Sequence, residues 1–176
     1  MGSDLDLLDR FTAGDVEGFR ELVRRYQGAV YGLAYRMTGC REDAEDVCQK
    51  TFLKVFLNCA GFERRSSFKT WVYAIAANTA MDRNKERKDS KTAPLDDIAS
   101  IASTDAGPAE VLENARDITK LRRAVDGLPD RQRAALVLKI YGALKYEEIA
   151  EVMKCSVGTV KAHCHGALAN LRKVMG

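Results

Sequence analysis

A cluster of carboxylates lies in the segment from Gly39 to Gln49, whose sequence is GCREDAEDVCQ. Negative charge in this place favours the N-terminus of a helix. Clustered carboxylates can also hold a metal ion or perform acid–base chemistry, but no histidine lies near them in the sequence and they point around the helix instead of along one face. We therefore expect this segment to contact a protein partner with a basic surface, and the alternative is a solvated helix face.

Aromatic, basic and small polar residues are interleaved in the segment from Phe62 to Arg83. This composition suits single-stranded nucleic acid, because bases stack on rings or enter pockets while cations hold the phosphates. The alternative is that Phe68, Trp71 and Tyr73 belong to the core, which we expect for Trp71 because it falls on an apolar helical stripe. The residues between Phe56 and Phe68 lack helical periodicity, and Gly61 gives the backbone freedom, which predicts a recognition loop at residues 60–69.

A third motif lies near the C-terminus. Residues 146–153 fit a short helix, residues 154–156 a tight turn, and residues 157–174 a longer helix that Ser156 can cap. Two helices joined by so short a turn form a helix-turn-helix, whose second helix enters the major groove of DNA. The alternative is a plain helical hairpin on a protein surface.

The elements that must position these motifs are all helical. Apolar residues recur at three- and four-residue steps, and no convincing stretch alternates with period two. Asp15 is a plausible N-cap for the first long stripe, and Gly39 is a plausible stop. The predicted helices cover residues 16–37, 42–56, 68–88, 109–125, 130–141, 147–153 and 157–174.

Residues 89–108 interrupt this pattern with a stretch rich in Asp, Ser, Thr and Ala that contains Pro94 and Pro108. The sequence therefore predicts an all-α protein with two small helical domains joined by a flexible acidic linker. We place the first domain at residues 1–90, the linker at residues 91–115 and the helix-turn-helix domain at residues 116–176.

The net charge of +3 is unevenly distributed along the chain. The balance is −2 for residues 1–61, +4 for residues 62–91, −5 for residues 92–117 and +6 for residues 118–176. Two basic blocks separated by an acidic one suggest two contacts with a polyanion, and the alternative is ordinary solvated surface.

Several classes of protein have little support in this sequence. It contains no apolar run of the roughly 20 residues that span a bilayer and no secretory leader, and five irregularly spaced cysteines suggest reduced thiols in a cytoplasm. A metal or redox sensor built on Cys155, His163, Cys164 and His165 is a weak alternative, because histidines two apart on a helix point in different directions. We find no nucleophile–base pair, P-loop or dinucleotide fingerprint, so we expect no enzyme, cofactor, metal or small-molecule substrate.

Two groups of motifs resemble the extracytoplasmic-function (ECF, group 4) family of sigma-70-type RNA polymerase sigma factors. The family pattern G-x-x-x-D-A-E-D-x-x-Q-x-x-F is matched from Gly39 to Phe52, and F-x-x-x-S-x-F-x-T-W-x-Y-x-I-A-x-N from Phe62 to Asn78. The second-domain patterns L-P-x-x-x-R and Y-x-E-I-A followed by G-T-V-K are matched at Leu128, Pro129, Arg133, residues 146–150 and residues 158–161.

The resemblance implies three sets of contacts. The clamp helices of the largest subunit of core RNA polymerase would be bound by Asp43, Glu45, Asp46, Gln49, Phe52 and Leu53. The minus-ten element of promoter DNA, with a flipped base, would be bound by Phe62, Arg64, Arg65, Ser66, Ser67, Lys69, Asn78, Asp82 and Arg83. The minus-thirty-five element would be read by Ser156, Thr159, Lys161, Ala162, His163 and His165, in a domain that also sits on the polymerase flap.

The resemblance also implies an anti-sigma factor as a partner and a place in the cytoplasm, at the nucleoid or held at the membrane by that partner without insertion of the chain itself. The chain departs from the family pattern at Gly166 and Leu168, where Arg is usual, at Ala162, where Ser is usual, and at Lys145, where a capping Ser is usual. A conventional helix-turn-helix regulator that acts without polymerase is the alternative function, but it gives no role to the motifs of the first domain.

Overall fold

The computed structural model describes residues 2–90 and 118–175. Within these ranges the chain consists of helices and turns without a strand, which confirms the predicted all-α fold. None of the helices in them is both long enough and apolar enough to cross a bilayer. The predicted linker at residues 91–115 and the first part of the helix predicted at residues 109–125 lie outside the described residues.

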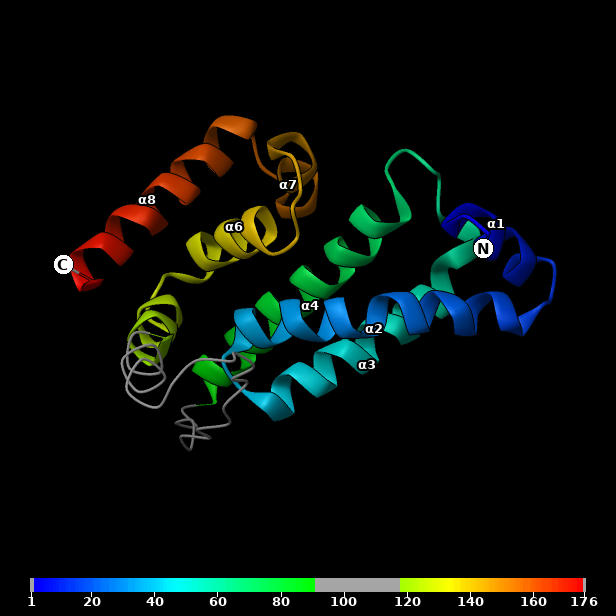
Figure 1. Cartoon of the computed structure of the whole chain (residues 1–176), viewed down its shortest axis with the longest axis horizontal. Coiled ribbons are helices and arrows are strands. Elements are labelled where there is room, and N and C mark those ends of the chain that lie inside the picture. The colour runs from blue at the N-terminus through cyan, green and yellow to red at the C-terminus, as the bar shows by residue number, and fades with distance from the viewer. Residues whose placement is uncertain (1, 91–117, 176) are drawn as a thin grey trace, which may run out of the picture.

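The N-terminal group contains four helices (Figure 1), which are α1 (Asp4–Thr12), α2 (Val16–Thr38), α3 (Arg41–Asn58) and α4 (Phe68–Asp89). The three longer helices pack against one another and bury Leu22, Leu33, Met37, Val47 and Val72 between them. Each of the three agrees with its predicted range to within two residues at either end, because a helix that buries one face must repeat its apolar residues at helical spacing.

Helix α1 is missed by the periodicity. Its start is marked by a capping box, in which the Ser3 side chain accepts from the Asp6 N–H at 3.2 Å and the Asp6 carboxylate accepts from the Ser3 N–H at 2.8 Å. Leu7 and Leu8 are buried and hold the helix on the core. A helix of nine residues is too short to show a long apolar stripe, so its periodicity does not predict it. The spacing of Ser3 and Asp6 is the sequence feature that could have predicted the start of this helix.

The ends of α2 follow the predicted caps. The Asp15 carboxylate accepts from the Glu17 N–H at 3.0 Å at the start of the helix. Gly39 follows the last turn with a φ of 70°, in the left-handed region that glycine adopts without steric cost. These two residues set the bounds of the longest helix and direct the chain into the carboxylate-rich start of α3.

The C-terminal group contains a helix at residues 118–126 followed by α6 (Asp130–Ile140), α7 (Tyr146–Met153) and α8 (Val157–Met175). Leu138, Ile149, Val152 and Val160 are fully buried among these helices. The Ser156 hydroxyl accepts from the Thr159 N–H at 3.1 Å and caps α8, so the predicted helix-turn-helix of α7 and α8 is confirmed.

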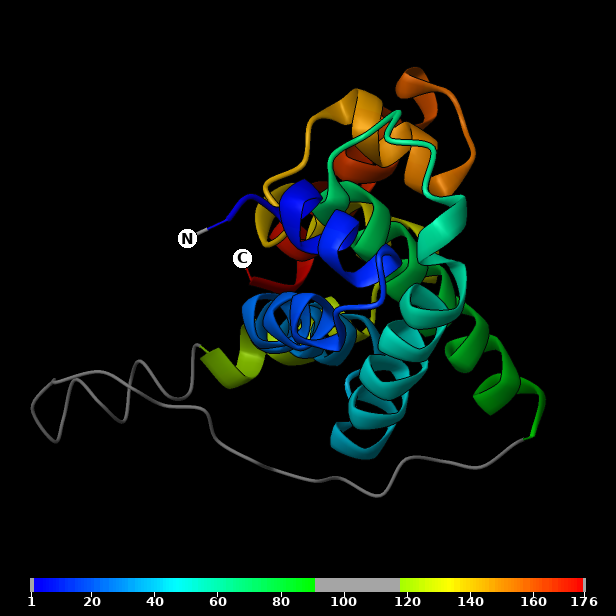
Figure 2. The same ribbon diagram turned by 90° about the vertical axis from the view of Figure 1, so that its right-hand side faces the viewer.

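The two groups are packed against each other. Helices α6 and α7 lie against α2 and α4, with α7 near the start of α4 (Figures 1 and 2). One hydrophobic cluster runs through both groups and includes Met37 and Val72 from the first and Leu138 and Ile149 from the second. The helices that carry the helix-turn-helix are therefore seated on the helices of the N-terminal group.

The turn between α6 and α7 contains an alanine in the left-handed region. Ala143 is exposed and has a φ of 54°. Because the left-handed conformation costs a residue with a Cβ atom about 1–2 kcal/mol, Ala143→Gly is expected to raise the free energy of unfolding by about 0.5–1 kcal/mol after the entropy cost of glycine. Urea denaturation measures this change.

The matched control for this substitution is Ala169→Gly. Ala169 is also exposed but lies inside α8, where glycine lowers stability by about 1 kcal/mol. If both substitutions lower the free energy of unfolding equally, the conformation of Ala143 carries no strain.

Candidate nucleic-acid and protein interface

The outer face of α3 combines acidic and apolar side chains. Glu45, Gln49 and Leu53 are exposed along it, and the side chains of Asp46 and Phe52 are half-buried. Two of its carboxylates form exposed ion pairs within the helix, Glu45 with Arg41 at 2.9 Å and Asp46 with Lys50 at 2.8 Å. Such pairs contribute little to stability, so a partner can replace them at small cost.

Two exposed apolar residues extend this face toward the end of α3 and are missed by the sequence analysis. Phe56 is 44% exposed and Leu57 is 68% exposed, next to Leu53 at 58%. The Phe56 ring contacts Phe11 and Phe19 at centroid distances of 5.1 and 5.2 Å. Their exposure could have been predicted from the sequence, because five of the six residues from 52 to 57 are apolar and one helix face cannot bury them all.

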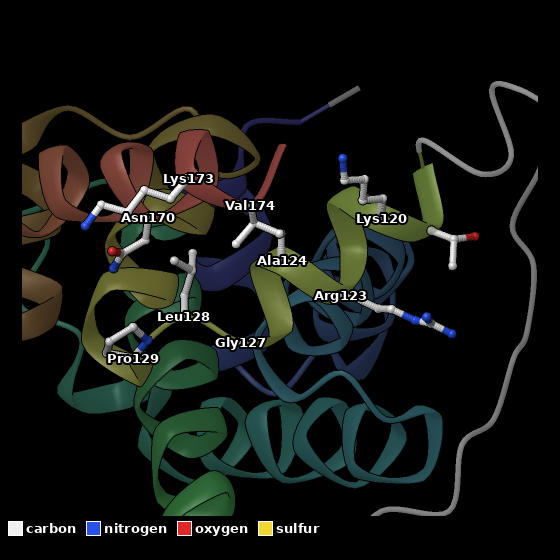
Figure 3. Close-up of a pocket in the computed structure, with 10 residues that line it drawn as sticks. Lys120, Arg123, Ala124, Gly127, Leu128, Pro129, Asn170, Lys173 and Val174 are labelled. Carbon is white, nitrogen blue, oxygen red and sulfur yellow. The ribbon is translucent and has the colours of Figure 1, made fainter. Parts of the chain in front are cut away.

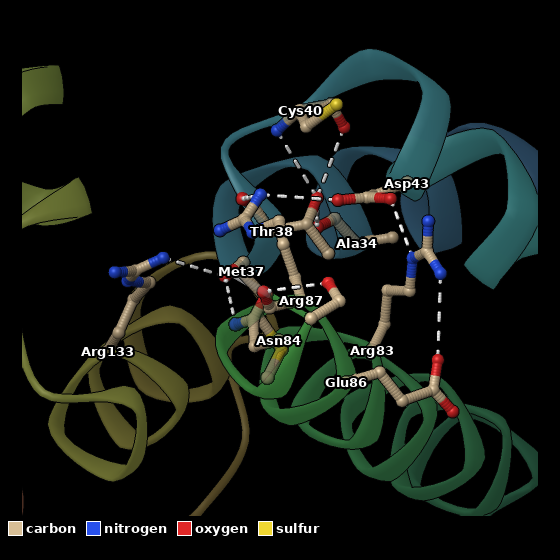
Figure 4. A network of polar contacts seen from close by, with 11 residues as sticks. Ala34, Met37, Thr38, Cys40, Asp43, Arg83, Asn84, Glu86, Arg87 and Arg133 are labelled. Atoms are coloured by element: carbon tan, nitrogen blue, oxygen red, sulfur yellow. Dashed lines mark hydrogen bonds and ion pairs between the residues drawn. The ribbon is translucent and has the colours of Figure 1, made fainter. Parts of the chain in front are cut away.

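Asp43 does not lie on this face, although the resemblance implies a polymerase contact for it. Its side chain is nearly buried, and its oxygens accept from Arg83 Nε at 2.7 Å and from Arg87 Nη1 at 3.2 Å (Figure 4). The first of these hydrogen bonds raises the pKa of Arg83 above its ordinary value. Arg87 also donates to the Thr38 carbonyl at 3.1 Å. Asp43 therefore joins α3 to α4 and to the end of α2.

Beside this network, the carbonyl of Met37 joins the two groups of helices. It accepts from Asn84 Nδ2 at 2.9 Å and from Arg133 Nη1 at 2.9 Å (Figure 4). Arg133 comes from α6 and is 6% exposed, and burial lowers the pKa of its guanidinium below the ordinary value. The arginine of the L-P-x-x-x-R motif therefore has a structural contact across the two groups.

The loop before α4 presents two arginines. Arg64 has a φ of 55° and forms an ion pair with Asp9, and Arg65 is paired with Glu63 at 2.7 Å on a side chain that is 85% exposed. The neighbouring Ser66 is half-buried. Ser67 is exposed but caps α4 by accepting from the Thr70 N–H at 3.0 Å. The loop thus offers cationic side chains on a rigid helix start, which suits a nucleic-acid contact.

Phe62 supports the loop from inside. It is 8% exposed, and its ring lies 4.8 Å from Trp71 and 6.2 Å from Phe68, measured between centroids. A base cannot stack on a ring that is already packed on both neighbours, so Phe62 is not placed for the direct DNA contact implied for it. The partly buried Trp71 packs against the core, as expected.

Along α4 the other residues implied in minus-ten binding differ in exposure. Asp82 is exposed, whereas Lys69 and Asn78 are half-buried, and the Lys69 ammonium lies 5.4 Å from the centre of the Tyr73 ring. Arg83 is held by Asp43, as described above. The accessible groups of this set are therefore concentrated in the loop and at Asp82.

Helix α8 presents its first turns to solvent. Thr159, Lys161, Ala162 and His165 are exposed, while His163 is half-buried and the hydroxyl of exposed Ser156 is used as the cap. Gly166 faces α6, because a Cβ atom built there would lie 2.9 Å from Gln132 Nε2. A side chain at that position would first meet the end of the Gln132 side chain, which would have to move to make room.

A solvent-open groove of about 980 Å³ lies between residues 118–126 and the end of α8 (Figure 3). Ala124, Leu128 and Val174 make it largely apolar, and Arg123 and Lys173 add positive charge at its rim. Among residues 2–90 and 118–175, no group of three or more His, Cys, Asp or Glu side chains is arranged to hold a metal ion.

Comparison with protein families matches both groups of helices. Residues 22–89 match the family described as sigma-70 region 2, and residues 118–171 match sigma-70 region 4. The ECF RNA polymerase sigma factor SigW of Bacillus subtilis is 31% identical over 91% of this chain and 90% of its own length. The ECF RNA polymerase sigma-E factor of Haemophilus influenzae is 35% identical over 91% of this chain and 88% of its own length.

Two solved structures share the fold. The sigma factor RpoE of Bartonella quintana, crystallised with the anti-sigma factor NepR, has a TM-score of 0.70 at 23% identity and covers 89% of this chain and 96% of its own. CnrH in complex with the cytosolic domain of CnrY has a TM-score of 0.69 at 24% identity and covers 98% of this chain and 96% of its own. With sigma-70 regions 2 and 4 matched in order and relatives matched over nearly their full length, the chain belongs to the ECF family of RNA polymerase sigma factors.

Proposed function

We propose that this protein binds core RNA polymerase and directs it to a specific set of promoters, and that it is not itself an enzyme. The observation that carries the proposal is the coexistence of three exposed surfaces on one family fold: the acidic and apolar face of α3, the loop with Arg64 and Arg65, and the first turns of α8. A regulator that acts without polymerase would use only the last of these.

The polymerase contact is assigned to α3. Glu45, Asp46 and Gln49 offer acceptors to a basic partner, and Phe52 and Leu53 add apolar area at the centre of the face. Phe56 and Leu57 enlarge that area. The groove beside α8 is the candidate seat of the polymerase flap, because it is concave and largely apolar.

The promoter contacts are assigned to two separate surfaces. Arg64, Arg65 and Lys69 would attract the phosphates of the minus-ten strand, with Ser66 near the flipped base. Thr159, Lys161, Ala162 and His165 would face the minus-thirty-five element in the major groove. This division gives each of the two positively charged blocks of the sequence its own DNA element.

We also propose control by an anti-sigma factor, working in the cytoplasm where polymerase and promoters are found. The support is that the sigma factor RpoE of Bartonella quintana was solved in complex with the anti-sigma factor NepR. The exposed Leu53, Phe56 and Leu57 on α3 are suited to such a partner, since apolar residues near a charged rim are typical of protein interfaces.

Run-off transcription with core RNA polymerase and a promoter library tests the proposed function. Promoter-specific transcripts are expected only when the protein is added, and the enriched promoters should share sequence at both the minus-ten and the minus-thirty-five positions. Duplex binding to a palindromic site without polymerase, together with no transcripts, would favour the conventional regulator instead.

Lys161 gives a finer test of the second DNA contact. Lys161→Ala is expected to weaken promoter binding by the polymerase complex about threefold to tenfold and to lower the slope of log K against log salt by about 1 if the ammonium meets a phosphate. Arg172→Ala, an exposed cation near the other end of α8, is the control and should leave both quantities unchanged. Unaltered binding by Lys161→Ala at every salt concentration would remove Lys161 from the interface.

A further inference from the structure

The ring of Tyr146, at the start of α7, lies beside two lysines from the neighbouring helices. The Lys139 ammonium of α6 lies 4.5 Å from the centre of the ring, and the Lys161 ammonium of α8 lies 5.6 Å from it. Both distances are within the roughly 6 Å at which a cation is attracted to the face of an aromatic ring. Tyr146 is the first residue of the Y-x-E-I-A motif, and none of the DNA or polymerase contacts assigned above involves it.

The position of this ring is fixed by its surroundings. Tyr146 is half-buried, and its side chain packs against the hydrophobic core. The ammonium of Lys139 also donates to the Leu144 carbonyl at 3.1 Å, so it has a definite place in the turn before α7. Because the core and Lys139 hold the ring in place, it offers a rigid surface to the second lysine.

Lys161 is oriented by this ring. The residue is exposed in the first turns of α8, and in the part of the chain that the structure describes its ammonium forms no hydrogen bond or ion pair. An exposed lysine has a flexible stem that samples many rotamers, and ordering it at an interface costs binding free energy. Contact with the ring limits this freedom before DNA arrives. The ammonium has three N–H groups, so donors remain for a phosphate or a base.

We propose that Tyr146 is a positioning residue for the minus-thirty-five contact, whose ring holds the Lys161 ammonium in the orientation that meets DNA. This inference rests on the proposed function and deepens it, because it adds a residue from the first helix of the helix-turn-helix to the DNA-reading surface of the second. Tyr146 acts through Lys161, so its effect on promoter binding disappears when Lys161 is removed.

The test compares Tyr146→Phe with Tyr146→pentafluorophenylalanine. Both substitutions remove the hydroxyl and keep a ring of similar size. Fluorine withdraws electrons from the ring and so removes the negative face that attracts a cation. Binding of the polymerase complex to a promoter duplex is expected to be about twofold to fivefold weaker for the fluorinated variant than for Tyr146→Phe.

A double-mutant cycle ties this difference to Lys161. When Lys161→Ala is also present, the two ring variants are expected to bind promoter equally, because no ammonium remains to respond to the ring. Arg172→Ala is the matched control, since Arg172 is an exposed cation near the other end of α8. In its presence the difference between the two ring variants should persist in full.

NMR spectroscopy of the whole chain, labelled with 13C-lysine, measures the contact without DNA. The protons on Cε of Lys161 are expected upfield of the usual lysine position in the parent and in Tyr146→Phe, because the ring current shields protons that lie over a ring face. In Tyr146→Leu, which keeps an apolar side chain but has no ring, the same signal should return to the usual position. The spectrum of Lys161→Ala identifies the signal by its absence.

Equal promoter binding by Tyr146→Phe and the fluorinated variant would overturn the positioning role. Tighter binding by the fluorinated variant would also overturn it, because the ring would then hold Lys161 away from DNA. A difference that persists without Lys161 would mean that the ring acts through another group, such as Lys139. If the parent complex binds no promoter, the proposed function is wrong, and the NMR shift still decides whether the ring orients Lys161.

Discussion

Replacing both Glu45 and Asp46 by lysine is expected to weaken binding to core RNA polymerase about 100-fold. The two carboxylates lie on the outer face of α3, where Glu45 pairs with Arg41 and Asp46 pairs with Lys50 of the same helix. Lysines there would place like charges against a basic partner, and such juxtaposition costs several kcal/mol, of which about 2.7 kcal/mol corresponds to 100-fold. Titration of labelled polymerase with the variant measures the affinity directly.

The control variant carries lysine at Glu17 and Glu86. These carboxylates are also exposed and pair with arginines of their own helices, at the start of α2 and near the end of α4. The change in net charge is the same, so general attraction or repulsion is matched. Equal affinities of the two double variants would show that α3 is not the polymerase contact.

Asp43→Asn is expected to lower the free energy of unfolding by about 2–3 kcal/mol. The carboxylate is buried and accepts from both Arg83 and Arg87, and hydrogen bonds to charged groups are each worth about 1.5–3 kcal/mol. Asparagine keeps the shape but has one acceptor oxygen and no charge, so one of the two hydrogen bonds from Arg83 and Arg87 is lost and the other is weakened. The side chains of Arg83 and Arg87 are 39% and 24% exposed, so water can partly replace the lost hydrogen bond. The expected loss in the free energy of unfolding is therefore near the lower end of the range for a broken buried ion pair.

Asp82→Asn is the matched control, since Asp82 lies on α4 one residue before Arg83 and is exposed. Its stability in urea denaturation is expected to stay within about 0.5 kcal/mol of the parent. The pair of variants also separates two roles for Asp43. If Asp43→Asn keeps full stability but loses polymerase binding, Asp43 contacts polymerase directly, and its ion pairs with Arg83 and Arg87 in Figure 4 do not stabilise the fold.

Most of the fold could be predicted because its signals are local. The stripe of α2, its cap at Asp15 and its stop at Gly39 depend on residues within one helix, and so does the capping of α8 by Ser156. Helix α1 was missed since its capping box is the sole strong signal in so short a segment. The motifs at residues 39–52, 62–78 and 146–161 also indicate the family, because each is a local pattern of residue types and spacing.

The site was predicted less completely, for a physical reason visible at particular residues. Phe62 and Asp43 have the types expected at a DNA or protein contact, but an aromatic ring or a carboxylate is equally suited to a core cluster or a buried ion pair. Which role it takes depends on partners far along the chain, such as Arg83, 40 positions after Asp43. Conversely, Phe56 and Leu57 are apolar residues of the kind usually found in a core, but both are exposed in the structure.

The sequence by itself determined two helical domains, the helix-turn-helix and membership of the sigma factor family, because helical periodicity, caps and motif spacing are properties of short segments. Only the tertiary structure decided that Asp43 is turned inward, that Gly166 faces Gln132, and that Gly32 makes room for Tyr141. Each of these depends on the close approach of two helices distant in sequence, and the packing of whole surfaces, not any single segment, determines where such approaches occur.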